Sequence, residues 1–285
     1  MELVDSGGAD QRARGGALPN VVIIGAQKCG TTALHSYMAR HPSISMSSPK
    51  ELNFFIDDRR EGNWHRGLDW YRSHFDPGAE IRGESSPNYT ADPLMPGVPE
   101  RMASVIPEAK LILLVRDPIE RVRAGYVHHY ANRVEKRGFA EAVLAPESPY
   151  IWRSRYHHQL DRWLEYYPLE QILVIAQEEL RKRRRPTLKL VWRFLGVREN
   201  VWREGFRKRR LKTEDIRRRT ALGALVADHI SHVRWRQLQR YRFFAHPFEP
   251  PEIDAEVHSA LAELLREDAQ RFREVTGQSF PQWSI

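Results

Sequence analysis

A single cysteine, Cys29, is present among the 285 residues of this sequence. One cysteine excludes an intrachain disulfide and a cysteine-rich zinc site. The sequence also lacks aspartate and histidine residues at metal-ligand spacing. The pairs at 128–129 and 157–158 do not fit a metal site, because neighbouring side chains on a helix diverge by about 100°. We therefore expect no bound metal, and we expect these histidines to be surface or packing residues.

Long apolar segments are missing as well. No run approaches the roughly 20 apolar residues that cross a bilayer, and the first 18 residues lack the apolar core of a secretory signal. Their Gly, Ala and charged residues predict a disordered tail over residues 1–18, followed by one domain over 19–285. We therefore expect a cytoplasmic protein without a membrane partner.

Positive charge is in excess, with a formal net charge of +8. This excess favours an anionic ligand without specifying it. Three arginine-rich runs, at 181–185, 207–210 and 217–219, leave a nucleic-acid-binding protein as one alternative, although such runs are usually solvated faces. A nucleic-acid-binding protein would show affinity that falls steeply with salt.

The order of apolar runs and amphipathic segments predicts an α/β fold. Short apolar runs indicate buried strands, and apolar residues every three or four positions indicate helices. Their alternation predicts a P-loop-like parallel sheet flanked by helices, in a single domain with a helical C-terminal part. Predicted strands cover 20–25, 82–84, 110–115 and 171–176, predicted helices cover 31–40, the second half of 62–75, 99–106, 119–133, 154–166, 187–195 and 252–277, and residues 42–53 are predicted as a loop.

The loop between the first strand and the first helix has the composition of a phosphate cradle. Its glycines, Gly25 and Gly30, let the backbone approach an anion closely, and the following helix begins with its positive dipole end at the ligand. An ATP-binding loop has the form GxxxxGK[ST]. Here Thr31 takes the place of that lysine, and the only lysine of the loop is Lys28. A P-loop kinase or NTPase using ATP and Mg²⁺ is therefore the alternative enzyme class.

Two further segments carry chemistry. Arg116 directly follows the apolar run at 110–115, so it lies at the ligand-binding edge of a parallel sheet and suits bidentate capture of a phosphate. Glu51 and Lys50 stand beside two phenylalanines in residues 48–55. A carboxylate in an apolar setting has a raised pKa and suits a general base, although a solvated loop carboxylate is the alternative.

Several neighbouring residues are predicted to have structural roles. Asp117 is expected to cap the helix that follows it, and Glu84 is expected to orient its loop through hydrogen bonds. Cys29 stands at a helix N-terminus, where the pKa of a thiol would fall, but we expect it only to be a small residue tolerated there. Lys50 is expected to be a surface charge.

The segments GAQKCGTTAL, PKELNFF, GESSPNYT, LVRDPIERVRAGY and FLGV occur in this order between residues 20 and 196. Together they resemble the sulfotransferases that use 3′-phosphoadenosine 5′-phosphosulfate (PAPS), in the style of the bacterial enzymes and of the glycan, heparan-type sulfotransferase domains. The resemblance implies in-line transfer of a sulfuryl group to a hydroxyl, or to an amine, of a carbohydrate or a secondary metabolite. It implies no nucleic-acid partner beyond the nucleotide cofactor.

The resemblance also assigns roles to residues. Glu51 would be the base that activates the acceptor, Lys28 would stabilise the leaving phosphate, and Arg116 would hold the 3′-phosphate of PAPS. Tyr156 would lie near the cofactor. The 5′-phosphosulfate would be bound by Gln27, Lys28, Cys29, Gly30, Thr31 and Thr32.

Three positions depart from the pattern of the family. Ala124 stands where the family usually has a serine that also holds the 3′-phosphate, so Arg116 would need another donor. Arg123 is adjacent in sequence but is expected to point elsewhere. Ser85 replaces a lysine and Asn53 replaces a histidine that glycan members use on the acceptor side.

Overall fold

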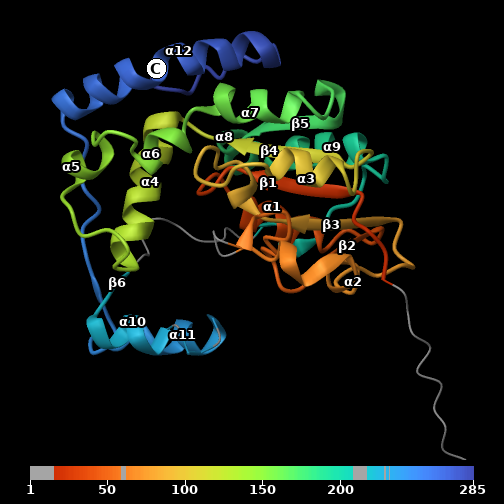
Figure 1. Cartoon of the computed structure of the whole chain (residues 1–285), viewed down its shortest axis with the longest axis horizontal. Helices are drawn as coiled ribbons and strands as arrows, with labels where there is room; N and C mark the ends of the chain where they lie inside the picture. Colours follow the sequence, from red (N-terminus) through yellow and green to blue (C-terminus); the bar gives the residue numbers. More distant parts are fainter. Residues whose placement is uncertain (1–15, 59–61, 208–216, 228, 231) are drawn as a thin grey trace, which may run out of the picture.

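The computed structural model describes residues 16–58, 62–207, 217–227, 229–230 and 232–285. Its centre is a parallel sheet of five strands in the order β2-β3-β1-β4-β5 (Figure 1). The strands are β1 (Val21–Gly25), β2 (Ile44–Met46), β3 (Ile81–Ser85), β4 (Lys110–Val115) and β5 (Ile172–Ala176). The predicted α/β fold with a parallel sheet is confirmed.

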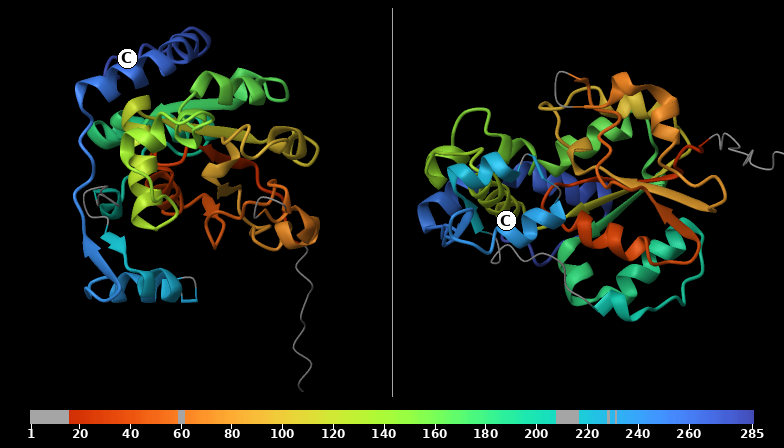
Figure 2. Two further views of the ribbon diagram at one scale, coloured as in Figure 1. Left: turned by 60° about the vertical axis from the view of Figure 1, so that its left-hand side comes forward. Right: turned by 90° about the horizontal axis from the view of Figure 1, so that it is seen from below.

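Strands β1 and β4 are apolar along their length, as expected where both faces of a sheet are covered. Every residue of β1 is buried, and so is every residue of β4 after Lys110. Figure 2 shows α1 (Thr31–Met38) and α9 (Arg184–Leu195) on one face of the sheet, with α3 (Val98–Ala103) and α7 (Tyr156–Leu164) on the other. Parallel sheets covered in this way have strands of continuous apolar sequence.

Helix boundaries follow local chemistry. Asp117 accepts a hydrogen bond from the backbone N–H of Glu120 at 2.9 Å and so caps the helix that begins at Pro118, as predicted. Gly196 and Gly277 end their helices in the left-handed conformation that glycine adopts freely. The other helices are α2 (Gly67–Arg72), α4 (Pro118–Ala131), α5 (Phe139–Val143), α6 (Pro149–Trp152), α8 (Gln177–Lys182), α10 (Ala221–Ala227), α11 (His232–Leu238) and α12 (Ala255–Thr276).

The sequence prediction was wrong at β2. This strand lies within 42–53, which was predicted as a loop, because a three-residue edge strand is too short to show a period. The helical spacing predicted for the second half of 62–75 corresponds to α2, which is preceded by a 3-10 turn at Trp64–Arg66. Residues 1–15 of the predicted tail and 208–210 of the second arginine run lie outside the described residues.

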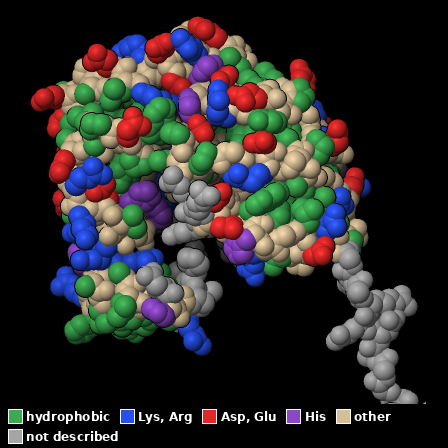
Figure 3. All heavy atoms as spheres, viewed as in Figure 1, with side chains coloured by type: hydrophobic (Ala, Val, Ile, Leu, Met, Phe, Trp, Pro, Cys, Tyr) green, Lys and Arg blue, Asp and Glu red, His purple; other side chains and the backbone are tan. Residues whose placement is uncertain are grey.

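Residues 217–247 form a lobe beside the sheet domain. Strands β6 (Arg217–Arg219) and β7 (Ala245–Pro247) pair antiparallel and support α10 and α11 (Figure 1). The guanidinium carbon of Arg218 lies 3.9 Å from the ring centroid of Tyr130 on α4, and that of Arg219 lies 4.9 Å from the ring centroid of Trp235. This arginine run therefore packs on aromatic rings. Apolar side chains remain exposed on the outer side of the lobe (Figure 3).

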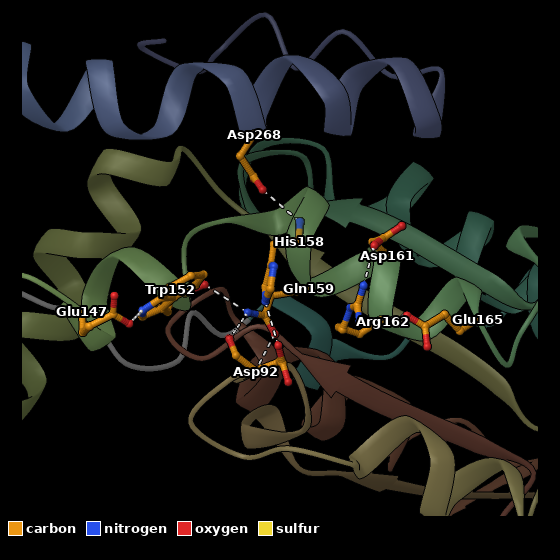
Figure 4. Close-up of polar contacts among 9 residues, drawn as sticks. All are labelled: Asp92, Glu147, Trp152, His158, Gln159, Asp161, Arg162, Glu165 and Asp268. Atoms are coloured by element: carbon orange, nitrogen blue, oxygen red, sulfur yellow. Dashed lines mark hydrogen bonds and ion pairs between the residues drawn. The ribbon is translucent and has the colours of Figure 1, made fainter.

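Helix α12 covers α7 and is joined to it by a partly buried carboxylate. Asp268 accepts the backbone N–H of His158 at 2.9 Å (Figure 4) and that of His157 at 3.0 Å, both in the first turn of α7. These N–H groups have no acceptor within their own helix. On the other side, His158 Nε2 contacts Asp92 Oδ2 at 2.8 Å. Asp268 thus supplies, from a distant helix, the cap that α7 lacks locally.

Replacing Asp268 with alanine should lower the free energy of unfolding by about 1–2 kcal/mol, because two N–H groups lose their acceptor. Urea unfolding would measure the change. The matched control is Glu267→Ala, which removes an exposed carboxylate paired with Arg271 and should cost less than about 0.5 kcal/mol. Equal losses in the two variants would contradict the capping role.

Candidate functional site

The carboxyl ends of β1, β3 and β4 meet at one edge of the sheet. Connections from β1 and β4 leave toward opposite faces there, which is where α/β sheets bind ligands. The loop at 25–32 follows β1, Arg116 follows β4, and the segment that begins at Ser86 follows β3. The segment at 48–55 lies beside β3, because the backbone N–H of Glu51 donates to the carbonyl of Ser85 at 3.1 Å. The three segments that the sequence singled out therefore converge.

The loop after β1 has the geometry of an anion cradle. Lys28 and Gly30 have positive φ angles of 70° and 94°, which turn the chain back toward α1. Among the residues that the structure describes, no side chain caps α1, so its first N–H groups, including those of Thr31 and Thr32, are available to a ligand. The helix dipole adds partial positive charge at the same point. A Cβ atom on Gly30 would lie 3.3 Å from the Cγ atom of Gln177, so the close packing favours glycine.

The charge on Lys28 is destabilised in this setting. Burial is the main cause that lowers the pKa of its ammonium, the positive charges of Arg121, Lys50 and Arg116 also lower it, and Glu51 raises it; the net change is from 10.5 to about 8. A negative ligand at the loop would offset the free-energy cost of holding the Lys28 ammonium charged in this buried, positive setting. The lowered pKa is therefore the electrostatic sign of a site built for an anion.

Glu51 faces Lys28 but differs from its expected setting. Its side chain is 43% exposed and forms an ion pair with Lys50, which matches the solvated loop carboxylate of the alternative and not an apolar setting. The neighbouring Leu52, Phe54 and Phe55 turn into the core instead. Lys50, expected to be a surface charge, is only 16% exposed and lies against the site. The Glu51 carboxylate and the Lys50 ammonium thus form an ion pair beside the loop at 25–32.

Arg116 lines a cleft of about 740 Å³ at the ends of β4 and β5. Its Nη2 lies 3.2 Å from Glu120 Oε2, while its Nε is buried and has no hydrogen-bond partner in the described part of the chain. Arg123, expected to point elsewhere, lines the same cleft, because its Nε is held by the carbonyl of Pro251 at 2.7 Å. Sequence reasoning also missed Gln177, Arg181 and Lys182 on this wall. The run at 181–185 is otherwise mostly exposed, as predicted.

Tyr156 and Cys29 join the two binding segments from inside. The fully buried Tyr156 hydroxyl accepts a hydrogen bond from the backbone N–H of Arg116 at 3.3 Å and lies 3.4 Å from Cys29 Sγ. The expectation of a lowered thiol pKa is wrong, because burial raises the pKa of Cys29. Neither side chain is exposed to a ligand, so both hold the loop and the end of β4 in position.

Two buried arginines that the sequence analysis did not select add positive charge behind the loop. Arg121 is fully buried, and none of its guanidinium nitrogens has a hydrogen-bond partner among the described residues. Arg153 donates to Asn88 Oδ1 at 2.9 Å, and burial together with Arg121 lowers its pKa to about 9. Gly125, one turn after Arg121, is the feature of the sequence that could have pointed to this arginine. The missing side chain of Gly125 leaves room for the guanidinium.

The positions that depart from the family pattern are all buried or partly buried. Ala124 is buried on α4 and offers no donor. The Ser85 hydroxyl and the Asn53 amide oxygen are buried without a partner among the described residues, as is Gln27 Oε1. His128, predicted to be a surface or packing residue, is mostly buried, and burial together with Lys28 lowers its pKa to about 3. Of the three unpartnered groups, only the Ser85 hydroxyl can donate to an anion, because the two amide oxygens are acceptors.

In the described part of the chain, no group of three or more His, Cys, Asp and Glu side chains is arranged to hold a metal ion. Among the same residues, no helix is both long enough and apolar enough to span a membrane.

The sequence and the fold were then compared with known proteins. The family described as "Sulfotransferase domain" matches residues 18–233. Human bifunctional heparan sulfate N-deacetylase/N-sulfotransferase 3 is 34% identical over 202 residues, covering 63% of this chain and 22% of that protein. The Caenorhabditis elegans enzyme 1 of this name is 31% identical over 188 residues, covering 60% and 21%. The chain spans about a fifth of the length of the curated relatives it matches.

Solved structures agree on the fold. A sulfotransferase from Alicyclobacillus acidocaldarius has a TM-score of 0.69 and 23% identity, covering 94% of this chain and 100% of that one. The sulfotransferase domain from the curacin biosynthetic pathway has a TM-score of 0.51 and 14% identity, covering 93% and 99%. Because the sulfotransferase domain covers most of its length, the chain belongs to the PAPS-dependent sulfotransferase family, as its motifs predicted.

Proposed function

We propose that this enzyme moves the sulfuryl group of PAPS to a hydroxyl or an amine of a carbohydrate or secondary-metabolite acceptor. The observation that carries the proposal is the buried Lys28 ammonium inside a loop that leads into the uncapped start of α1. Relatives named as heparan sulfate N-sulfotransferases support an amine on a glycan as one acceptor. PAPS supplies a sulfuryl group on a phosphate leaving group, so the chain has to bind two anionic ends and deprotonate the acceptor.

The loop is suited to the leaving phosphate. Lys28 and the N–H groups at the start of α1 converge where negative charge would grow as the bond from sulfur to the phosphate oxygen breaks. Donors fixed before reaction stabilise such charge without reorganising. Arg121 and Arg153, buried behind the loop, add to the positive potential.

Glu51 is suited to the acceptor. Its carboxylate lies close enough to Lys28 to raise the pKa of that lysine, so both groups face the same space. Glu51 would take the proton of the acceptor as the new bond to sulfur forms, and Lys50 would hold the carboxylate in place. Its partial exposure suits an acceptor that arrives from solvent.

Arg116 is suited to the 3′-phosphate. Its side chain faces the cleft, and the missing donor at Ala124 can be replaced by Arg123, whose guanidinium is anchored on the same wall. A kinase or NTPase is not favoured, because Thr31 is buried where an ATP-binding loop holds its lysine.

Calorimetry should show tight, metal-independent binding of 3′-phosphoadenosine 5′-phosphate (PAP), the product left by PAPS. Lys28→Ala and Arg116→Ala should each weaken it at least about tenfold, since each removes a charge-assisted contact. Arg193→Ala is the matched control, because Arg193 pairs with Glu199 away from the cleft. Preference for ATP with Mg²⁺, or binding of a short DNA duplex that is indifferent to Lys28→Ala, would refute the assignment.

Glu51→Gln should retain PAP affinity and lower turnover about 10²- to 10⁴-fold, because the amide cannot accept the proton. Transfer of radioactive sulfate from PAPS can be measured with de-N-sulfated heparin, p-nitrophenol and a simple glycoside as probe acceptors. Unchanged turnover on every accepted probe would remove Glu51 as the base.

PAP affinity should fall as pH rises through about 8, the pKa of Lys28 in the free protein. Below this pH the ammonium is already charged, whereas above it binding must take up a proton, so affinity should fall by up to about tenfold per pH unit. Calorimetry from pH 6.5 to 9.5 in two buffers of different ionisation enthalpy would show the proton uptake. Lys28→Arg should flatten the profile, and the same slope in that variant would place the titrating group elsewhere.

A further inference from the structure

The side chain of Glu84 is a carboxyl group enclosed in the core. It belongs to β3, opposite Val22 of β1, and it is fully buried. It accepts hydrogen bonds from three hydroxyls, those of Tyr71 at 2.8 Å, Tyr89 at 2.9 Å and Ser86 at 3.2 Å. Burying a carboxylate is expensive even with such partners, so stability alone gives no reason for an acid here.

Two of the three hydroxyls also hold the loop that carries Glu51. Ser86 Oγ accepts the backbone N–H of Asn53 at 3.0 Å, and the Tyr89 hydroxyl accepts that of Phe55 at 3.4 Å. A hydroxyl has one proton, so donating it to Glu84 turns the oxygen lone pairs toward the loop. The carboxylate thereby sets the direction of both contacts, and the hydrogen bonds in such chains strengthen one another.

The loop needs this support because its backbone is strained. Glu51 and Asn53 have φ angles of 67° and 48°, in the left-handed region that non-glycine residues rarely occupy. Such conformations persist where the surroundings determine them, and they gather at functional sites. The hydrogen bonds to Ser85, Ser86 and Tyr89 fix the backbone N–H groups of residues 51, 53 and 55 in turn.

We propose that Glu84 is a positioning residue that orients Glu51 for the acceptor through the hydroxyls of Ser86 and Tyr89. The inference rests on the proposed role of Glu51 as the base. Burial raises the pKa of Glu84, and the three hydroxyl donors and nearby Lys50 lower it. The net result is a pKa of about 7. Tyr71 touches the same carboxyl group from α2, but its hydroxyl makes no hydrogen bond to the loop among the described residues.

Tyr71 therefore provides a matched control. Tyr71→Phe and Ser86→Ala each remove one hydroxyl donor from Glu84, but only Ser86→Ala also removes an acceptor from the loop. Ser86→Ala and Tyr89→Phe should lower kcat about 10- to 100-fold while PAP affinity stays within about twofold, because base alignment controls the chemical step. Tyr71→Phe should leave kcat within about twofold, since the ring packed on Phe54 remains. Ser86→Thr should restore most of the loss.

Melting temperature separates positioning from folding. Similar decreases in Tyr71→Phe and Ser86→Ala, with loss of kcat only in the latter, would support the proposal. Equal loss of kcat in both, or none in Ser86→Ala, would overturn it. Glu51→Gln distinguishes failure of the positioning role of Glu84 from failure of the base assignment of Glu51. If Glu51→Gln is inactive and Ser86→Ala is fully active, only the positioning role fails. If Glu51→Gln is fully active, the base assignment fails first. In the Glu51→Gln background, Ser86→Ala should have no further effect on kcat.

Discussion

Buried positive charge at the carboxyl edge of the sheet is the constraint on which the site depends. Lys28, Arg121 and Arg153 are withdrawn from water at the end of β1, and burial lowers the pKa of each. Arg116 adds a mostly buried guanidinium at the end of β4. An anion bound here would offset the cost of burying several cations close together. The parallel sheet makes this arrangement possible, because it brings the ends of distant strands to one place.

The acidic side of the site is built on a different principle. Glu51 stays partly in water and close to Lys50, which suits the acceptor-side role proposed for it. Its backbone is held from below by β3, where the buried Glu84 orders the hydroxyls that face the loop. The cations of the proposed cofactor side are thus fixed by burial, and the proposed base is fixed by a hydrogen-bond network. This division explains why the loop at 48–55 tolerates left-handed residues.

Much of the fold and part of the site could be predicted from local sequence. The apolar run at 110–115 coincides with β4, and glycine marks the ends of α9 and α12. The phosphate loop and Arg116 were selected from their places after predicted strands, Glu51 was selected through the family resemblance, and their roles stay predictions; the sulfotransferase family was predicted correctly. An exposed loop carboxylate was the alternative for Glu51, but the sequence could not decide it, and the inward turn of Tyr156 could not be predicted, because both depend on which neighbours the fold supplies. The cytoplasmic location and the tail at 1–18 stay predictions.

The sequence by itself determined the parallel sheet, the anion-binding loop and the displacement of its lysine to position 28, because these follow from hydrophobic period and glycine spacing. Tertiary structure alone decided which charges share the site. Arg121 and Arg153 add positive charge to the site only because they are buried behind the loop. Arg123 faces the cleft because the carbonyl of Pro251 holds its guanidinium. Glu84 contacts the loop that carries Glu51 only through hydroxyls. Distance and desolvation control electrostatics, and neither is encoded locally in the chain.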